Sequence, residues 1–211
     1  YAYQSQINPH FLYNMLQCLR GISLMHDIPE VAQICTNMAD LFRYSIKGAF
    51  LVPLENELNI IDKYLYMIEV RFQGRITYKL EISDDTKNCL IQKMILQPIV
   101  ENAIFHGLDE IEEGGIITIK TTRSEDDLYI TVTDNGVGFS KEMLYDLTRK
   151  LEEEITFINN SSSGTSDNIG VINIHNKIRL YEGNTYGVSI DSIPNHTSVT
   201  LHLNAKQQTT T

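Results

Sequence analysis

Cysteine is scarce in this sequence, and long apolar runs are missing. Three cysteines occur in 211 residues without a CxxC pair or a Cys/His cluster at zinc spacing, which excludes a disulfide scaffold. No window approaches the about 18 apolar residues of a membrane span, and no signal peptide is present. A helical pattern is already running at Tyr1, which favours a fragment whose upstream part is missing.

Positive charge is also in short supply. The chain has 17 Lys and Arg against 27 Asp and Glu, a formal net charge of -10. Without a basic run or stripe, direct binding of nucleic acid is not expected. A small anionic nucleotide is still compatible with this charge, because backbone amides and a metal ion hold it locally. The 42% of hydrophobic and 21% of charged residues indicate an ordinary globular protein.

The N-terminal part of the chain predicts helices. In the first of them an apolar residue recurs every three or four positions, at Phe11, Met15, Leu19 and Ile22. Gly21 and the stretch 26–29 predict the first break, and a second helical pattern follows over 31–45. Pro53 opens a third helix, which we expect over 54–71.

After Gly74 the pattern changes to alternation, which predicts strands joined by helices. We expect strands over 76–82, 117–121, 128–132, 187–192 and 197–203. We also expect helices over 93–106, with a kink or restart at Pro98, and over 170–181. The stretch 140–168 is polar and irregular. Helices first and then a mixed unit predict an α+β protein with a boundary near residue 74.

The string Asp134-Asn135-Gly136-Val137-Gly138 ends one of the predicted strands. A carboxylate at a strand end can accept a hydrogen bond from the exocyclic amine of adenine. The glycines that follow let the backbone approach a base closely. An ordinary β-turn that begins with aspartate is the alternative interpretation.

Glu101 and Asn102 are adjacent polar residues in an otherwise apolar helix. Burial without partners would cost about 1–3 kcal/mol for each of them, which favours a function. An asparagine oxygen is a suitable Mg²⁺ ligand when phosphates and water fill the other positions. The carboxylate beside it could act as a base. A pair on the helix surface is the alternative.

Gly170 and Asn173 stand at the start of a predicted helix that follows a Ser/Gly-rich stretch. Glycine-rich backbone at a helix N-terminus is typical of a phosphate cradle, and Lys177 on the same helix could add positive charge. A plain junction between loop and helix, with a basic surface, is the alternative.

His10 follows a proline in a helical segment. A lone histidine is more often structural than catalytic, but neutral imidazole is a good nucleophile near pH 7. A neighbouring ATP site would make this histidine a phosphoryl acceptor. Asn14 lies four residues further on and therefore on the same helix face.

Together, the order and spacing of these segments resemble the LytS-like sensor histidine kinases. The resemblance covers nearly the whole chain, and its most specific strings are QINPHFLYN (6–14), LQPIVENA (96–103) and DNGVGF (134–139). It implies a dimeric helical hairpin that carries the phosphoacceptor over 1–74. A Bergerat-type α/β sandwich that binds ATP would follow over 75–205, and 206–211 would form a polar tail.

The resemblance also implies roles for single residues. His10 would be the phosphoacceptor, Asn102 the Mg²⁺ ligand and Asp134 the residue that recognises adenine. Gly136 and Gly138 would form the pocket floor. The stretch 140–168 would be the lid, with Gly170 at its phosphate-facing hinge. Phe11 stands where many histidine kinases have an acidic residue, so Glu101 is the candidate base. Asn14 would orient a water that dephosphorylates the partner.

The implied partners are a second copy of the chain, in a four-helix bundle, and a response regulator that often carries a LytTR domain. The missing upstream part would be a membrane sensor, which makes this chain its cytoplasmic portion.

Four positions depart from the family pattern, at Phe105, Asn168, Lys177 and His196. They motivate a second hypothesis, a dimeric signalling adaptor with a weak nucleotide site. A simple ATPase or a serine kinase of the same fold is a third hypothesis, against which the His10 segment argues.

Overall fold

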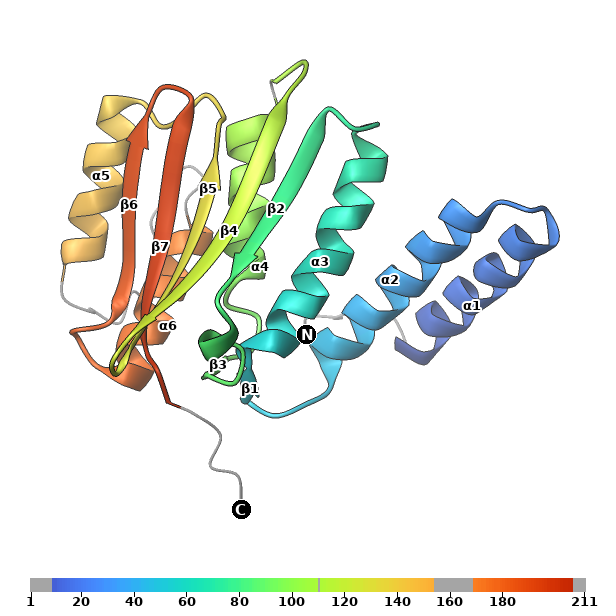
Figure 1. Cartoon of the computed structure of the whole chain (residues 1–211), viewed down its shortest axis with the longest axis horizontal. Coiled ribbons are helices and arrows are strands. Elements are labelled where there is room, and N and C mark those ends of the chain that lie inside the picture. Colours follow the sequence, from blue (N-terminus) through green and yellow to red (C-terminus); the bar gives the residue numbers. More distant parts are fainter. Residues whose placement is uncertain (1–8, 110, 154–168, 207–211) are drawn as a thin grey trace, which may run out of the picture.

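The computed structural model describes residues 9–109, 111–153 and 169–206 (Figure 1). The chain begins with α1 (Pro9–Met25), α2 (Pro29–Ile46), β1 (Leu51–Pro53) and α3 (Leu54–Arg71). Then come β2 (Ile76–Ile82), η1 (Asp84–Thr86), β3 (Leu90–Gln92), α4 (Gln97–Asn102) and η2 (Ala103–Leu108). The last elements are β4 (Gly115–Ser124), β5 (Asp127–Asp134), α5 (Lys141–Glu152), α6 (Ile169–Glu182), β6 (Gly187–Ile193) and β7 (His196–Asn204).

Helices α1 and α2 form an antiparallel hairpin that projects from one side of the molecule (Figure 1). The break between them lies between Met25 and Pro29, as expected, and Pro29 takes the first turn of α2, where its missing N–H costs nothing. Gly21 does not break the helix as expected. It lies inside α1, and a Cβ at this position would meet only open space.

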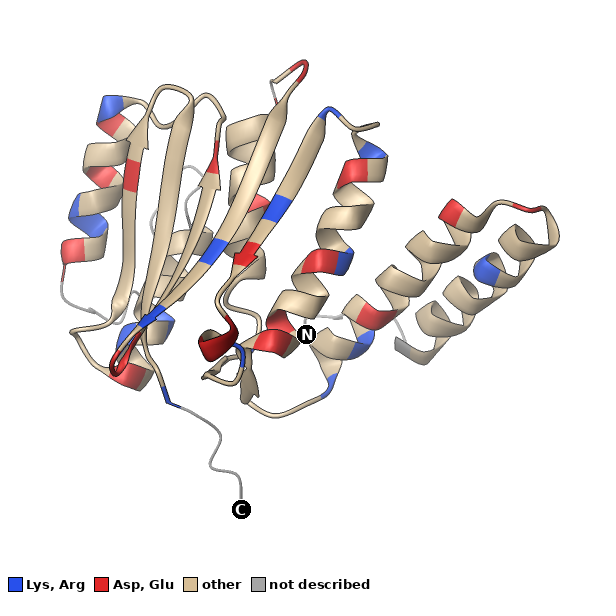
Figure 2. Cartoon of the chain, viewed as in Figure 1, with Lys and Arg blue, Asp and Glu red and all other residues tan. Residues whose placement is uncertain are grey.

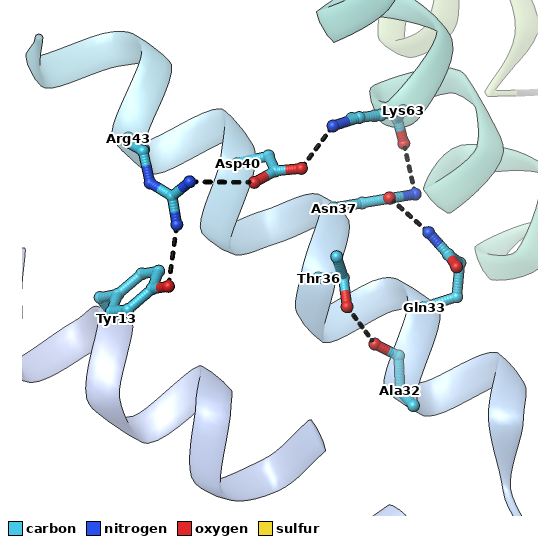
Figure 3. Close-up of polar contacts among 8 residues, drawn as sticks. All are labelled: Tyr13, Ala32, Gln33, Thr36, Asn37, Asp40, Arg43 and Lys63. Atoms are coloured by element: carbon cyan, nitrogen blue, oxygen red, sulfur yellow. Dashed lines mark hydrogen bonds and ion pairs between the residues drawn. The ribbon is translucent and has the colours of Figure 1, made fainter. Parts of the chain in front are cut away.

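A chain of polar side chains joins the hairpin to α3 (Figure 3). The Arg43 guanidinium donates to the Tyr13 hydroxyl of α1 over 2.8 Å and pairs with Asp40 over 3.8 Å. Asp40 in turn pairs with the Lys63 ammonium on α3. Asn37, which is buried, donates to the Lys63 carbonyl over 3.3 Å. These directional bonds fix how α2 of the hairpin is aligned along α3.

The second half of the chain is a mixed five-stranded sheet in the order β2-β4-β5-β7-β6. Strands β2 and β4 are parallel, whereas the other three pairings are antiparallel. Burial alternates along β5, so every second residue faces the layer of helices. A separate two-stranded ladder joins β1 to β3. These elements confirm the expected α+β class and the five expected strands.

One hydrophobic core lies between the sheet and its helices. Residues of α3 from Leu54 to Ile68, and Phe72 directly after the helix, belong to this core together with α4, α6 and the inner face of the sheet. By packing, α3 is thus continuous with the sheet half, and the hairpin is the part that stands apart. The domain boundary near residue 74 stays a prediction.

Besides the break at Gly21, two further expectations about local structure are wrong. The helix expected over 93–106 begins only at Gln97, with Pro98 in its first turn, and it widens into a π-helical turn at η2. The stretch expected to be irregular contains α5, which begins where the Ser140 hydroxyl accepts a hydrogen bond from the Met143 N–H. Residues 154–168, the rest of the expected lid, lie outside the described residues.

Across the described ranges, no helix combines the length and the apolarity that a membrane crossing requires.

Candidate active site

A cavity of about 210 Å³ opens where α4 and η2 meet the ends of β5 and β7. Three of the residues predicted from sequence line it, namely Asn102, Asp134 and Gly138. The other lining residues are Ala103, His106, Gly107, Val137, Phe139, Met143, Thr197 and Val199. The structure therefore brings the Asn102 segment and the Asp134 segment together, although 32 positions separate them in the numbering.

Asp134 is the buried acidic group of this cavity. It is 4% exposed, and burial raises its pKa to about 6, while a hydrogen bond from the Gly136 N–H acts in the opposite direction. That N–H lies 2.9 Å from Oδ1 of the carboxylate. The side chain thus keeps acceptor capacity toward the cavity, as recognition of an amine requires.

Glycine is required on both sides of this carboxylate. A Cβ at Gly107 would lie 2.6 Å from Asp134 Oδ1, and a Cβ at Gly136 would lie 2.0 Å from the Gly107 carbonyl oxygen. The Val137 N–H also donates to the Gly107 carbonyl over 3.0 Å. The turn after β5 is therefore fitted directly onto η2, and side chains on either glycine would push the two walls apart.

Hydroxyl groups hold another edge of the cavity. The Phe139 N–H donates to Ser192 Oγ over 3.0 Å, and Ser192 Oγ lies 3.1 Å from Thr197 Oγ1. Thr197 is buried and lines the cavity from β7. These bonds connect the turn after Gly138 to the hairpin between β6 and β7, so that the cavity has fixed edges.

Asn102 lies at the end of α4 and is one of the lining residues of the cavity. The described residues contain no group of three or more His, Cys, Asp or Glu that could hold a metal ion. A Mg²⁺ ion at Asn102 would therefore take its other ligands from phosphate groups and water, which is the usual environment of Mg²⁺ in nucleotide sites.

Glu101 does not line the cavity. Its carboxylate accepts a hydrogen bond from the Gln97 side chain over 2.8 Å, on the same helix. Gly170 and Asn173 are exposed in the first turns of α6, where a Cβ on Gly170 would lie 3.7 Å from Pro98. None of these three residues is among those that line the cavity.

Lys177 is not brought to the cavity either. Its ammonium donates to the carbonyl of Lys93 over 3.1 Å, and its pKa is lowered, chiefly by burial. A half-buried lysine bonded to backbone braces the junction between α6 and the start of α4. In this structure it has no contact with the cavity.

His10 lies on the hairpin, and it is not among the residues that line the cavity. The side-chain nitrogen of Asn14 lies 3.2 Å from His10 Nδ1, so the expected pairing along one helix face is present. The phosphoacceptor candidate and the nucleotide cavity are thus separate parts of the chain in this arrangement.

Sequence reasoning missed several lining residues, among them His106, Gly107 and Met143. Gly107 carries a signal of its own, a glycine in the segment that follows Asn102, but only the packing against Asp134 explains it. Met143 belongs to the helix α5 that was expected to be irregular.

Comparisons with known proteins agree with this geometry. Residues 1–76 match the family described as "Histidine kinase", and residues 91–207 match "Histidine kinase-, DNA gyrase B-, and HSP90-like ATPase". The sensor histidine kinase YesM of Bacillus subtilis is 32% identical over 90% of this chain and 30% of its own length. The sensor protein kinase HptS of Staphylococcus aureus is 31% identical over 85% of this chain and 33% of its own length.

Solved structures share the fold. The histidine kinase domain of a blue-light activated kinase from Erythrobacter litoralis EL346 aligns with a TM-score of 0.52 and 16% identity over 93% of this chain and 94% of that one. The catalytic domain of the histidine kinase ThkA aligns with a TM-score of 0.51 and 14% identity over 77% of this chain and 100% of that one.

The chain spans about a third of the length of the curated relatives named above. The resemblance to sensor histidine kinases is confirmed by both matched segments and by these relatives. The chain belongs to the histidine kinase family, and its second half is an ATPase domain of the type that histidine kinases share with DNA gyrase B and HSP90.

Proposed function

We propose that this chain uses ATP to phosphorylate its own His10 and then passes the phosphoryl group to an aspartate of a response regulator. The observation that carries this proposal is a pair of sites in one chain. A buried carboxylate, Asp134, shares a cavity with Asn102, and a histidine stands one helical turn from an asparagine on a separate hairpin.

In this reaction a nitrogen of His10 attacks the γ-phosphorus in line. The N–P bond forms as the bond to the bridging β–γ oxygen breaks, and ADP leaves with that electron pair. Mg²⁺ bound by Asn102 and the phosphates would supply neutralisation of the phosphate charge. Asp134 would hold the adenine amine, and Gly107 and Gly136 keep the wall close to the base.

Asn14 has a positioning role in this proposal. A side-chain amide can present its oxygen instead of its nitrogen, and then it accepts from His10 Nδ1–H. That bond leaves the lone pair on Nε2, which becomes the attacking atom. Asn14 is also our candidate to orient a water during dephosphorylation of the regulator, and full phosphatase activity of Asn14→Ala would contradict that second role.

The proton released by His10 has no assigned acceptor. Glu101 is the candidate base from its place beside Asn102, and a rearrangement would be needed because it is bonded to Gln97 here. Glu101→Gln is a direct check on this role, since it keeps the shape of the side chain and removes its basicity.

Exposed apolar residues on the hairpin support a homodimer. Phe11, Met15, Leu19 and Ile22 are 60%, 42%, 52% and 49% exposed and share one face of α1. Among Lys, Arg, Asp and Glu, the sequence of α1 contains Arg20 alone. The ribbon of α1 is accordingly tan over most of its length in Figure 2. Two copies could bury these faces in a four-helix bundle. A regulator of the LytTR type and an upstream membrane sensor, with this portion in the cytoplasm, complete the proposal.

The adaptor hypothesis keeps one observation in its favour. Phe105 and Lys177, two of the departures from the family pattern, offer no cation to the cavity, because Lys177 is bonded to Lys93. The retained Asp134 and Asn102 in one cavity favour the kinase.

The decisive experiment is autophosphorylation with γ-labelled Mg-ATP, comparing the wild-type chain with His10→Gln. The chain is first shown to be dimeric or is tethered as a dimer. We expect an acid-labile, base-stable label that the substitution abolishes, while nucleotide affinity is unchanged. ATP binding by a dimer that incorporates no label would favour the adaptor. An acid-stable label in the His10→Gln chain would favour a serine kinase.

A further inference from the structure

Glu57 is a buried carboxylate that the proposed reaction does not use. It lies in the first turns of α3 and is 2% exposed. One oxygen, Oε1, accepts two hydrogen bonds, from the Tyr44 hydroxyl over 2.6 Å and from the Met94 N–H over 2.7 Å. Burying a carboxylate is costly unless it is well bonded, so such a group is retained where its bonds matter.

These two bonds join distant parts of the chain. Tyr44 belongs to the last turns of α2, the second helix of the hairpin. Met94 lies three residues before α4, the helix that ends at Asn102. The phenol of Tyr44 is the donor, because burial and then the bond to Glu57 raise its pKa far above the usual range. Glu57 therefore connects the end of the hairpin to the segment before α4 through hydrogen bonds to a single carboxylate oxygen.

The turn at Met94 needs this support. Met94 has φ +63°, a left-handed conformation that costs energy in a non-glycine residue. The neighbouring Lys93 is held from three sides, as its N–H donates to the Phe50 carbonyl, its ammonium donates to the Lys47 carbonyl and its carbonyl accepts from Lys177. These hydrogen bonds hold the strained turn in one conformation, so they also fix where the following helix α4 begins.

The other end of the same helical segment is fixed by a different part of the molecule. The Gly107 carbonyl in η2 accepts from the Val137 N–H, in the turn that follows Asp134. Asp134 itself is placed by β5, whose neighbours are β4 and β7. Asn102 lies between these two fixed ends, so its position depends on the Met94 end, whereas Asp134 does not contact that end.

We propose that Glu57 is a positioning residue that sets the place of Asn102 and couples it to the end of the hairpin through Tyr44. This inference rests on the proposed role of Asn102 toward Mg²⁺. It predicts that loss of the Glu57 bonds weakens the Mg²⁺-dependent part of nucleotide affinity and leaves the part that depends on adenine.

The test measures the affinity of the full chain for ATP by calorimetry, with saturating Mg²⁺ and with a chelator. In Glu57→Met, which keeps the length of the side chain and removes the acceptor, we expect the gain in affinity that Mg²⁺ gives to fall about 10-fold, the size typical of losing a group that supports a metal ligand. Affinity without metal is expected to match the wild type, because Asp134 is unaffected. A purely structural role would lower the melting temperature and leave this gain unchanged.

The same helix provides a matched control. Asp62 accepts a hydrogen bond from the Tyr78 hydroxyl over 3.0 Å, a carboxylate–tyrosine pair like that of Glu57 but remote from Met94. Asp62→Asn is expected to keep the full Mg²⁺ gain. Tyr44→Phe, which leaves the Met94 bond in place, should give a smaller loss than Glu57→Met and no further loss in the double variant, because both act through Oε1.

The outcomes separate this inference from the proposed function. A wild-type Mg²⁺ gain that a folded Glu57→Met chain retains would overturn the inference alone. Equal losses with and without metal would also overturn it, since Glu57 would then support the whole cavity. A wild-type chain without any Mg²⁺ gain would overturn the role of Asn102 and this inference together. Should Glu57→Met fail to fold, Tyr44→Phe decides by the same two measurements.

Discussion

The hairpin and the sheet half of this chain treat their apolar residues in opposite ways. In the sheet half, Ile117, Ile119, Leu128 and Ile130 are fully buried in one core. In the hairpin, Leu19 and Met25 are 52% and 83% exposed. A helix pair that leaves this much apolar surface in water is incomplete alone, whereas the sheet half closes its own core. The comparison suggests that only the first region needs a second copy of the chain.

The largest effect should come from a charge on the exposed face of the hairpin. Burial of a leucine stabilises by about 1.5–3 kcal/mol, and a symmetric dimer loses it twice, so Leu19→Glu should weaken dimerisation by about 3–6 kcal/mol. That corresponds to about 10²–10⁴-fold in the dissociation constant, which analytical ultracentrifugation measures.

Leucine on the sheet half offers the matched control. Leu180 on α6 is 64% exposed, and Leu180→Glu is expected to leave the oligomeric state as it is. If Leu19→Glu and Leu180→Glu changed the dissociation constant of the dimer equally, or if neither changed it, the contrast between the two regions would be refuted.

A middle-sized effect concerns Asp134 and pH. Its folded pKa of about 6 lies above the ordinary 3.8, so the folded state binds the proton more tightly. The resulting stabilisation is fully present below pH 3.8 and is lost as pH rises through about 6, a change of about 3 kcal/mol. Urea unfolding between pH 4 and 7 measures it. Asp134→Asn should remove this slope, and Asp191→Asn, at an exposed carboxylate of β6, should keep it.

The same substitution should also impair nucleotide binding. The Gly136 N–H would hold the new amide oxygen, which turns the amide NH₂ toward the adenine amine and sets donor against donor. A lost charge-assisted bond of about 1.5–3 kcal/mol predicts about 10- to 100-fold weaker binding. Unaltered dimerisation of Asp134→Asn would sharpen the contrast, since the defect would stay in the sheet half.

The smallest effect is expected where the two regions touch. Asp40 of the hairpin and Lys63 of α3 form a partly exposed ion pair, with side chains 26% and 37% exposed (Figure 3). A double-mutant cycle with Asp40→Asn and Lys63→Met should give a coupling of about 0.2–1 kcal/mol in unfolding at constant protein concentration. A coupling well above that range would mean that the ion pair fixes the hairpin, and the two regions would not be independent.

Much of the fold followed from local sequence patterns, because those patterns and the packing agree. Pro53 and the acidic first turn predicted α3 with its observed bounds, and alternation predicted the strands. Helix α5 was missed although Ser140 and the spacing of Leu147 and Leu151 indicate it. The Ser/Gly-rich stretch after it led the whole range 140–168 to be interpreted as a loop.

The cavity was predictable in part, and the limit is a physical one. Asp134 and Asn102 stand out in sequence because burying a polar group beside an apolar run is costly unless the group has a partner. Lys177 also stood out, but its position on a helix does not tell where a long side chain finds its partner, and that partner is the Lys93 carbonyl. Glu57 is one of two acidic residues in the first turn of α3, and the sequence gave no signal that it, and not Glu55, would be buried.

The position of β7 in the sheet affects how this site is made during synthesis. β7 pairs with β5 on one side and with β6 on the other, and it contributes Thr197 and Val199 to the cavity. During synthesis, β5 leaves the ribosome before residues 196–204 do. At that stage the edge of β5 that later pairs with β7 is open, and the cavity beside Asp134 lacks the wall that Thr197 and Val199 form. The nascent chain must wait for its last strand to insert between two others before it can bind ATP, and until then the open edge is available to chaperones.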